Sequence, residues 1–251
     1  MHGAAGFGKG GMRRMLRKPG GELWITPQDR DCTGSTTRQD CGMSQPWISA
    51  NLAFSADGKI SDALHRPSGW TSKADHERLI ALRRDADALM VGRGTLEKDR
   101  MSLRSPGSTK APLRCIVSRS GRISPEHPVF HTEGGPVHLL ITGDTASPDL
   151  AGVVIHRGTL MGFVKTLAAN HGVGRLHCEG GGELIRSLAE LDLIDELHLT
   201  LAGRTIFGGA AAPTITGIPG DFLPGSRSFT LQTFEPQPET GECFLTYLRK
   251  R

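Results

Sequence analysis

The stretch Leu176–Leu184, LHCEGGGEL, decides the fold. A short apolar run ends at Cys178 and Glu179, three glycines follow, and the helix-like segment ELIRSLAEL starts at once. Glycine lets the backbone come close to a ligand, and the free N–H groups and dipole of a helix start favour an anion. Three consecutive glycines exceed what one turn needs, so we expect Gly180–Gly182 to hold a phosphate rather than only to turn the chain.

Strand-like and helical patterns alternate on both sides of this stretch. The expected helices cover residues 72–86, 160–170 and 183–191. The expected strands cover residues 47–55, 86–92, 113–118, 137–142, 153–156, 175–179 and 195–203, and a hairpin of 228–234 and 242–248 follows. This order predicts an α/β fold with three layers and a mostly parallel sheet that has an antiparallel C-terminal edge.

Residues 46–251 are predicted to form this single domain. Residues 1–45 are rich in glycine and arginine and poor in periodic apolar residues, which predicts a disordered extension. Gly3–Gly10 reads G-x-x-x-x-G-K-G, but no Ser or Thr follows Lys9 and no strand precedes it, so we do not expect a P-loop.

Composition excludes several classes of protein. The formal net charge is +4, but five cations and no acid lie in the first 20 residues, so the rest of the chain carries −1. We therefore do not expect the chain after these residues to bind nucleic acid. No apolar run approaches the roughly 18 residues of a membrane span. The five cysteines are odd in number and have no C-x-x-C spacing, which favours free thiols in the cytoplasm.

The ten histidines do not suggest a metal site. His127 and His131 are four residues apart but straddle Pro128, so no helix face is expected to join them. His171 and His177 are isolated in the sequence. We therefore expect no metal ligands.

Four motifs stand in a fixed order: SADGK at 55–59; SGWTS at 68–72 with Arg83; VGRGT at 91–95, preceded by Asp87-Ala88 and followed by Asp99; and EGGG at 179–182 followed by LIDEL at 193–197. Together they resemble the pyrimidine reductase family of riboflavin biosynthesis, the reductase half of a bifunctional deaminase–reductase. The resemblance covers roughly Pro46 to Leu248 and implies a dihydrofolate-reductase-like fold. The zinc deaminase signature P-C-x-x-C is absent from the sequence, so the chain resembles a stand-alone reductase.

The resemblance implies an activity as well as a fold. It implies that NADPH donates a hydride to a small-molecule substrate, a phosphorylated ribosylamino-pyrimidine, and gives the ribitylamino product. It also implies a homodimer. Two alternatives stay open: a reductase of the same fold that acts on a pterin or another heterocycle, and a nucleotide-binding protein without turnover.

The resemblance also implies site residues. Asp57 and Lys59 take the catalytic positions. The cofactor positions are Phe54, Trp70, Arg93, Thr95, Asp99, Ser118, Gly180, Gly181, Gly182, Glu183 and Leu184. The substrate positions are Asn51, Ser68, Arg83, Leu103, Arg104 and Glu179.

Simpler roles compete with several of these assignments. Asp57 has the residue type that starts a turn with Gly58. Arg93 either binds the 2′-phosphate of NADPH or is a solvated loop charge, and one of the neighbours Arg83 and Arg84 is expected in solvent. Since Glu183 would repel a phosphate, the contact there would come from backbone N–H groups. The family often has lysine where Asn51 stands.

Overall fold

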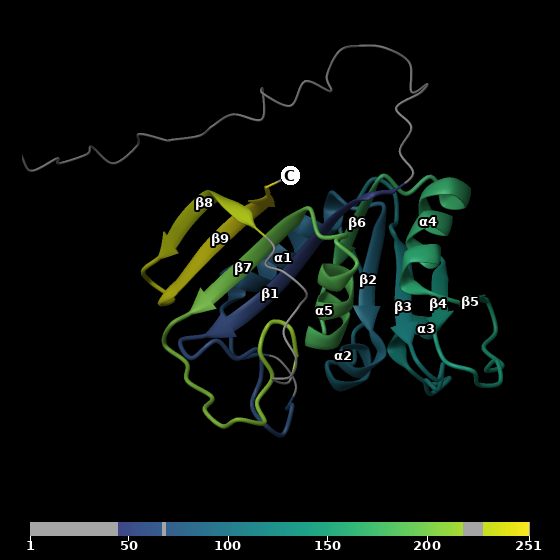
Figure 1. Ribbon diagram of the computed structural model, residues 1–251, viewed down its shortest axis with the longest axis horizontal. Coiled ribbons are helices and arrows are strands. Elements are labelled where there is room, and N and C mark those ends of the chain that lie inside the picture. The colour runs from purple at the N-terminus through teal and green to yellow at the C-terminus, as the bar shows by residue number, and fades with distance from the viewer. Residues whose placement is uncertain (1–44, 67–68, 218–227, 251) are drawn as a thin grey trace, which may run out of the picture. The chain divides into compact units, whose positions relative to one another are not determined.

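A computed structural model describes residues 45–66, 69–217 and 228–250. In this part of the chain nine strands form one sheet (Figure 1). The strands are β1 (Trp47–Ser55), β2 (Ala88–Gly92), β3 (Leu113–Ser118), β4 (Val137–Ile141), β5 (Val153–Arg157), β6 (Arg175–Cys178), β7 (Glu196–Ala202), β8 (Phe229–Gln237) and β9 (Glu242–Arg249). The helices are α1 (Lys73–Arg84), α2 (Arg93–Lys98), α3 (Pro128–His131), α4 (Leu160–His171) and α5 (Gly182–Glu190). The predicted extension 1–45 lies outside the described residues except for its last residue, so it stays a prediction.

The strand order is β5-β4-β3-β2-β6-β1-β7-β9-β8. Strands β1 to β7 run parallel, and β9 and β8 pair antiparallel at the far edge. The predicted α/β fold with a mostly parallel sheet and an antiparallel C-terminal edge is therefore confirmed. Strand β6 returns late in the chain and fills the place between β1 and β2. Strands β2 to β5 lie on one side of this place in the sheet and β7 lies on the other, so the strand order reverses here. In open α/β sheets, ligands bind at the carboxyl ends of the strands at such a reversal.

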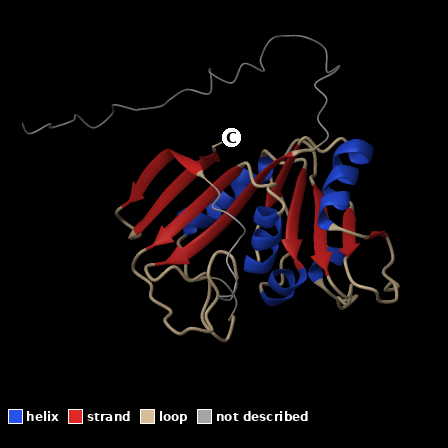
Figure 2. Cartoon of the chain, viewed as in Figure 1, coloured by secondary structure: helices blue, strands red, loops and turns tan. Residues whose placement is uncertain are grey.

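Helices lie on both faces of the sheet, which gives the three layers (Figure 2). The alternation along β2 separates the two cores. Ala88 and Met90 pack with α4 and α5, whereas Leu89 and Val91 pack with α2 and α3. All four side chains are fully buried, because a central parallel strand is covered on both faces. Figure 1 draws α4 and α5 in front of the sheet and α1 behind it.

The residues at the ends of α1 and α4 explain where these helices begin and where α4 ends. The hydroxyl of Ser72 accepts a hydrogen bond from the Asp75 N–H, as expected of an N-cap, and Thr159 caps α4 in the same way. Gly172 ends α4 in the left-handed conformation that glycine adopts without a steric cost. No helix in the described ranges has the length and apolar character needed to cross a membrane.

Two short helices were not expected. The sequence predicted no helix face that joins His127 and His131; α3 begins at Pro128 and ends at His131, and His127 stands just before it. Proline fits the first helical position, where its missing N–H would have no partner inside the helix, and the His127 side chain accepts the Val129 N–H as the N-cap. Helix α2 has only six residues, too few to show an apolar period.

A polar layer lies between α1 and the sheet. His177 in β6 is 1% exposed, and its Nδ1 shares a hydrogen bond of 2.8 Å with the hydroxyl of Ser49. Its Nε2 has no hydrogen-bond partner among the described residues. Burial lowers the pKa of His177 to about 3 and that of His198 in β7 to about 4, so both rings stay neutral in the folded protein.

This layer predicts a pH-dependent stability. An unfolded histidine takes up a proton near its ordinary pKa of 6.5, whereas buried His177 does so only near 3. The contribution of neutral His177 to the free energy of unfolding should therefore be complete above pH 6.5. It should decrease as the pH is lowered from 6.5 toward about 3. Urea unfolding across this range measures the slope, and His177→Gln should reduce it. His131→Gln, on the exposed surface of α3, is the control; equal slopes for wild type and His177→Gln would contradict the assignment.

Candidate functional site

A cavity of about 1200 Å³ opens at the carboxyl ends of the central strands. Its walls come from the end of β1, from the turns after β2 and β3, and from the glycine turn after β6. The segments are Asn51–Ala53, Gly92–Thr95, Ser118–Ser120 and Gly181–Leu184. Pockets for small molecules commonly measure about 300–1000 Å³, so this cavity has room for an extended ligand such as a dinucleotide together with a second small molecule.

Each glycine of the turn has a structural reason. Gly180 and Gly181 have φ of +88° and +76°, values that other residues rarely adopt. A Cβ on Gly182 would lie 2.3 Å from the backbone nitrogen of Gly217, so only glycine lets this loop cross the start of α5. The argument that three glycines exceed the needs of one turn is therefore wrong.

The start of α5 nevertheless has the properties of an anion site. Within the described ranges, the backbone N–H groups of Gly182 and Glu183 have no acceptor. Both residues line the cavity. Leu184, Ile185 and Leu188 anchor the helix in the core. Free N–H groups at a fixed helix start are suited to a phosphate, and the dipole adds to this.

The turn after β2 lies against the glycine turn. A Cβ on Gly181 would be 2.9 Å from the hydroxyl of Thr95, so these two parts of the cavity wall are in contact. Arg93 forms an ion pair of 2.7 Å with Glu97 one helical turn on, and its side chain is 40% exposed. The guanidinium of Arg93 is thus already engaged with a carboxylate.

A buried ion pair supports the wall below the glycine turn. Arg83 Nε lies 2.5 Å from Glu179 Oε1, and Arg83 Nη2 lies 2.6 Å from Oε2. The third nitrogen of Arg83 donates to the carbonyl of Arg104 at 2.7 Å. Both side chains are almost completely buried. Of the two residues, Glu179 lines the cavity and Arg83 does not. Of the two neighbouring arginines, Arg84 is the exposed one.

Among the described residues, Asp57 connects its own turn to the loop at Phe207 and Gly208. Its carboxylate accepts hydrogen bonds from the hydroxyl of Ser55 and from the N–H groups of Phe207 and Gly208. The Ser55 hydroxyl contributes most to a lowered pKa of Asp57. Lys59 forms an isolated β-bridge with Thr214. Neither Asp57 nor Lys59 lines the cavity, so the geometry favours the simpler alternative, in which they hold the turn and the 203–217 loop.

The other predicted site residues divide into two sets. Those that line the cavity are Asn51, Trp70, Arg93, Thr95, Asp99, Ser118, Glu179, Gly181, Gly182, Glu183 and Leu184. Those that do not are Phe54, Asp57, Lys59, Arg83, Leu103, Arg104 and Gly180. Leu103 is 1% exposed and packs in the core beside α2 and α3, and Arg104 is exposed. Ser68 lies outside the described residues.

Several lining residues were not predicted. Arg119 and Ser120 follow β3 in the run SRSGR, and the Arg119 side chain is exposed. The sequence signal that could have identified Arg119 as a site residue is a cationic side chain directly after a buried strand. Pro213 and Gly217 come from the loop over α5, and no local pattern in the sequence points to them. His171, expected to be isolated, lies beside His138 and His156 away from the cavity.

A buried carboxylate fixes the wall that contains Trp70. Glu242, at the start of β9, accepts from the Ser72 N–H at 2.7 Å and from its hydroxyl at 2.5 Å. Arg204 reaches the same carboxylate at 3.4 Å and also donates to the carbonyl of Trp70. The Trp70 ring packs edge-on against Phe207, with 5.0 Å between ring centroids. These contacts hold the aromatic ring at the cavity.

Residues 46–230 match the family described as RibD C-terminal domain. A 2,5-diamino-6-ribosylamino-4(3H)-pyrimidinone 5′-phosphate reductase of Archaeoglobus fulgidus is 29% identical over 68% of this chain and 86% of its own length. The protein of that name from Methanothermobacter thermautotrophicus is 29% identical over 69% of this chain and 85% of its own length.

Solved structures show the same fold. Acinetobacter baumannii RibD superposes with a TM-score of 0.70 at 20% identity and covers 83% of this chain and 59% of its own. The riboflavin biosynthesis reductase Rib7 of Saccharomyces cerevisiae has a TM-score of 0.65 at 15% identity, with 84% of this chain and 93% of its own covered. At these identities the likeness concerns the fold alone.

The buried ion pair predicts a large loss of stability. Glu179→Ala leaves Arg83 without its carboxylate partner in a buried place, which typically costs about 3–5 kcal/mol. Arg84→Ala removes an exposed neighbour on the same helix and should change the free energy of unfolding by no more than about 0.5 kcal/mol. Urea unfolding compares the two; a Glu179→Ala variant as stable as the Arg84→Ala control would show that the pair is not structural.

Proposed function

The chain belongs to the RibD C-terminal domain family, and on that premise we propose that it reduces a phosphorylated ribosylamino-pyrimidine with NADPH in riboflavin biosynthesis. The product is the ribitylamino compound. A hydride enters at C1′ of the sugar, one proton is taken up, and the C1′–O4′ bond opens. The single observation that carries the proposal is the large cavity at the strand-order reversal, with a glycine turn and a helix start in its wall.

The residues present fit a dinucleotide. When bound, NADPH supplies the hydride, so the protein has to position the reactants and complement their charge. The N–H groups of Gly182 and Glu183 would hold the pyrophosphate, because backbone donors at a helix start need no cationic side chain. The carboxylate of Glu183 would then point away from the phosphate.

Arg119 is the cation best suited to the 2′-phosphate of NADPH. It lines the cavity at the carboxyl end of β3, and its backbone is fixed by a hydrogen bond of 2.9 Å from the Gly143 N–H to its carbonyl. No carboxylate is paired with its guanidinium among the described residues. Arg93, for which the sequence left open this contact or a solvated loop position, is paired with Glu97. A guanidinium binds phosphate through two parallel hydrogen bonds.

The substrate would occupy the part of the cavity beside Asn51, Ala53 and Glu179. Arg83 holds the Glu179 carboxylate through two hydrogen bonds, which leaves its orientation fixed before any ligand binds. Such preorganisation lowers the entropic cost of reaching a reactive geometry. The homodimer that the resemblance implies and the cytoplasmic location that the cysteine pattern favours stay predictions.

One observation favours an alternative substrate. The resemblance implied that Arg83 and Arg104 contact the substrate, and Arg104 its phosphate, yet Arg83 is bound to Glu179 and neither side chain lines the cavity. The same fold and cofactor could then serve a pterin or another heterocycle. A protein that binds NADPH tightly but reduces none of these compounds would match the third alternative, a nucleotide-binding protein without turnover.

The activity is tested with purified full-length chain, NADPH and the phosphorylated ribosylamino-pyrimidine. We expect NADPH oxidation that depends on the substrate. Gly182→Ala should weaken NADPH binding by at least about tenfold, because the added Cβ would displace the loop at Gly217 and disturb the helix start. Gly203→Ala, with no described atom within 4 Å of the added Cβ and no place in the cavity wall, is the control. Folded protein that leaves NADPH unoxidised with the pyrimidine and with related heterocycles would refute the proposal.

Cofactor preference is tested at Arg119. Arg119→Ala should raise the KM for NADPH by about ten- to a hundredfold and leave that for NADH unchanged, since hydrogen bonds to charged groups contribute about 1.5–3 kcal/mol. Arg93→Ala should have a smaller effect because its guanidinium is shared with Glu97. Arg122→Ala, exposed and outside the cavity wall, is the control. A large NADPH effect in Arg93→Ala but not in Arg119→Ala would move the 2′-phosphate to the β2 turn.

A further inference from the structure

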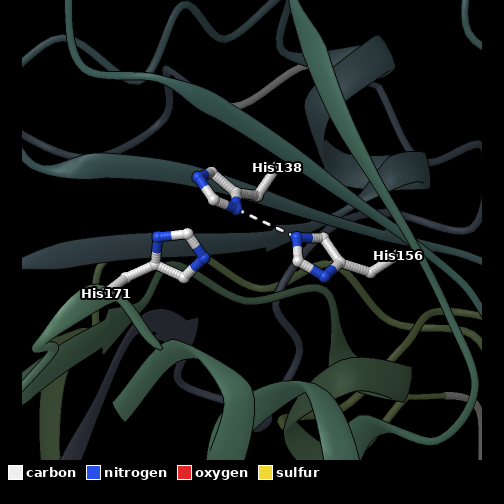
Figure 3. Close-up of side chains that lie close together, drawn as sticks. All are labelled: His138, His156 and His171. Atoms are coloured by element: carbon white, nitrogen blue, oxygen red, sulfur yellow. Dashed lines mark hydrogen bonds between the residues drawn. The ribbon is translucent and has the colours of Figure 1, made fainter. Parts of the chain in front are cut away.

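Three histidines from different elements converge on the α4 side of the sheet, outside the cavity wall (Figure 3). His138 belongs to β4, His156 to the edge strand β5, and His171 is the last residue of α4. One nitrogen of each ring can be chosen so that all three lie within 4.8 Å of one another. His138 Nδ1 and His156 Nε2 are 3.0 Å apart and share a hydrogen bond.

The surrounding structure holds these rings in place. The parallel register pairs Leu140 with His156, so His156 stands diagonally across from His138 on the same face. Phe163 of α4 packs against the His156 ring at 4.8 Å between centroids. The His138 and His171 rings meet edge to face at 4.6 Å. The three imidazoles are therefore brought together by packed secondary structure rather than by a loop.

We propose that His138, His156 and His171 form a binding site for a divalent transition metal of the zinc class, with three imidazole ligands and a fourth position open to solvent. This proposal replaces the sequence-based expectation of no metal ligands. It does not depend on the proposed reductase function, because none of the three residues lines the cavity.

The distances suit a tetrahedral ion. Zinc–nitrogen bonds measure about 2.0–2.1 Å, which places ligand nitrogens about 3.4 Å apart. The present separations of up to 4.8 Å need only small side-chain rotations to reach this value. His138 is buried and His171 is exposed, so the site lies at the surface of the domain, where a fourth position is open to solvent.

The ligand set selects the class of metal. The group consists of imidazoles alone, with no carboxylate or thiolate among the described residues that take part. Calcium and magnesium prefer oxygen ligands, whereas imidazole suits zinc, copper and nickel. The hydrogen bond between His138 Nδ1 and His156 Nε2 places one N–H between the two rings. Binding of the metal to both nitrogens therefore moves this proton to the other nitrogen of its ring.

The location indicates what the metal would do. Strand β5 forms the outer edge of the parallel part of the sheet, and Val154 on it is 43% exposed. A metal held by β4, β5 and the end of α4 would link the edge strand to the helix that covers it. Because the metal binds the folded arrangement, it would stabilise this edge by mass action.

The test uses full-length protein stripped with a chelator and titrated with Zn²⁺ and, separately, Co²⁺. We expect one zinc site, a rise in Tm of several degrees, and the intense visible d–d absorption of four-coordinate Co²⁺. Nitrogen and water ligands give no thiolate charge-transfer band, which distinguishes this site from metal bound by the cysteines at 32 and 41.

His171→Ala is the decisive variant, because His171 is exposed and its loss should leave the fold intact. Zinc affinity should fall at least tenfold in His171→Ala and in His156→Ala, and the zinc-dependent rise in Tm should disappear. His131→Ala, an exposed histidine outside the cluster, is the matched control. Wild-type protein that binds no Zn²⁺, or zinc binding unchanged in His171→Ala, would overturn the proposal. NADPH oxidation reports only on the reductase function and is expected to persist in all three variants.

Discussion

The close backbone approach at Gly182 is the constraint on which the site depends. Strand β6 fills the place between β1 and β2, so the turn that follows it has neighbours on three sides. Leu52 lies beside Gly180, Thr95 beside Gly181, and the loop at Gly217 crosses Gly182. Side chains at these positions would separate the sheet from α5. Their absence brings a helix start with free N–H groups to the carboxyl ends of three strands, and that arrangement makes the cavity wall.

Buried carboxylates then fix the parts of the wall that the sheet cannot reach. Glu179 binds the α1 residue Arg83, and Glu242 binds Ser72 at the other end of the same helix. A buried carboxylate is costly unless it is paired and hydrogen-bonded, so each of these contacts tolerates little displacement. Helix α1 is polar along most of its length and is held to the sheet by such contacts more than by an apolar face.

Much of the fold could be predicted because the information is local. The buried strand ALMVG at 88–92 and the cap residue Ser72 need only their neighbours in sequence to be recognised. The site was harder, because its geometry depends on pairs far apart in the chain. Arg83 and Glu179 are 96 residues apart, and no pattern showed that they would bind each other. For the same reason the sequence left the role of Asp57 open between catalysis and the turn, and it did not show that the carboxylate accepts a hydrogen bond from a loop some 150 residues away.

Helix α4 joins the two proposed sites and sets how far they can influence each other. Leu160 at its start lines the cavity, and His171 at its end belongs to the histidine cluster. Twelve residues of helix span about 18 Å, and Phe163, Val164 and Leu167 between the two ends are buried in one core. A close-packed helix of this kind resists small displacements. A metal at the far end would therefore change how often the edge of the sheet opens, while the geometry at Leu160 in the closed protein would stay the same.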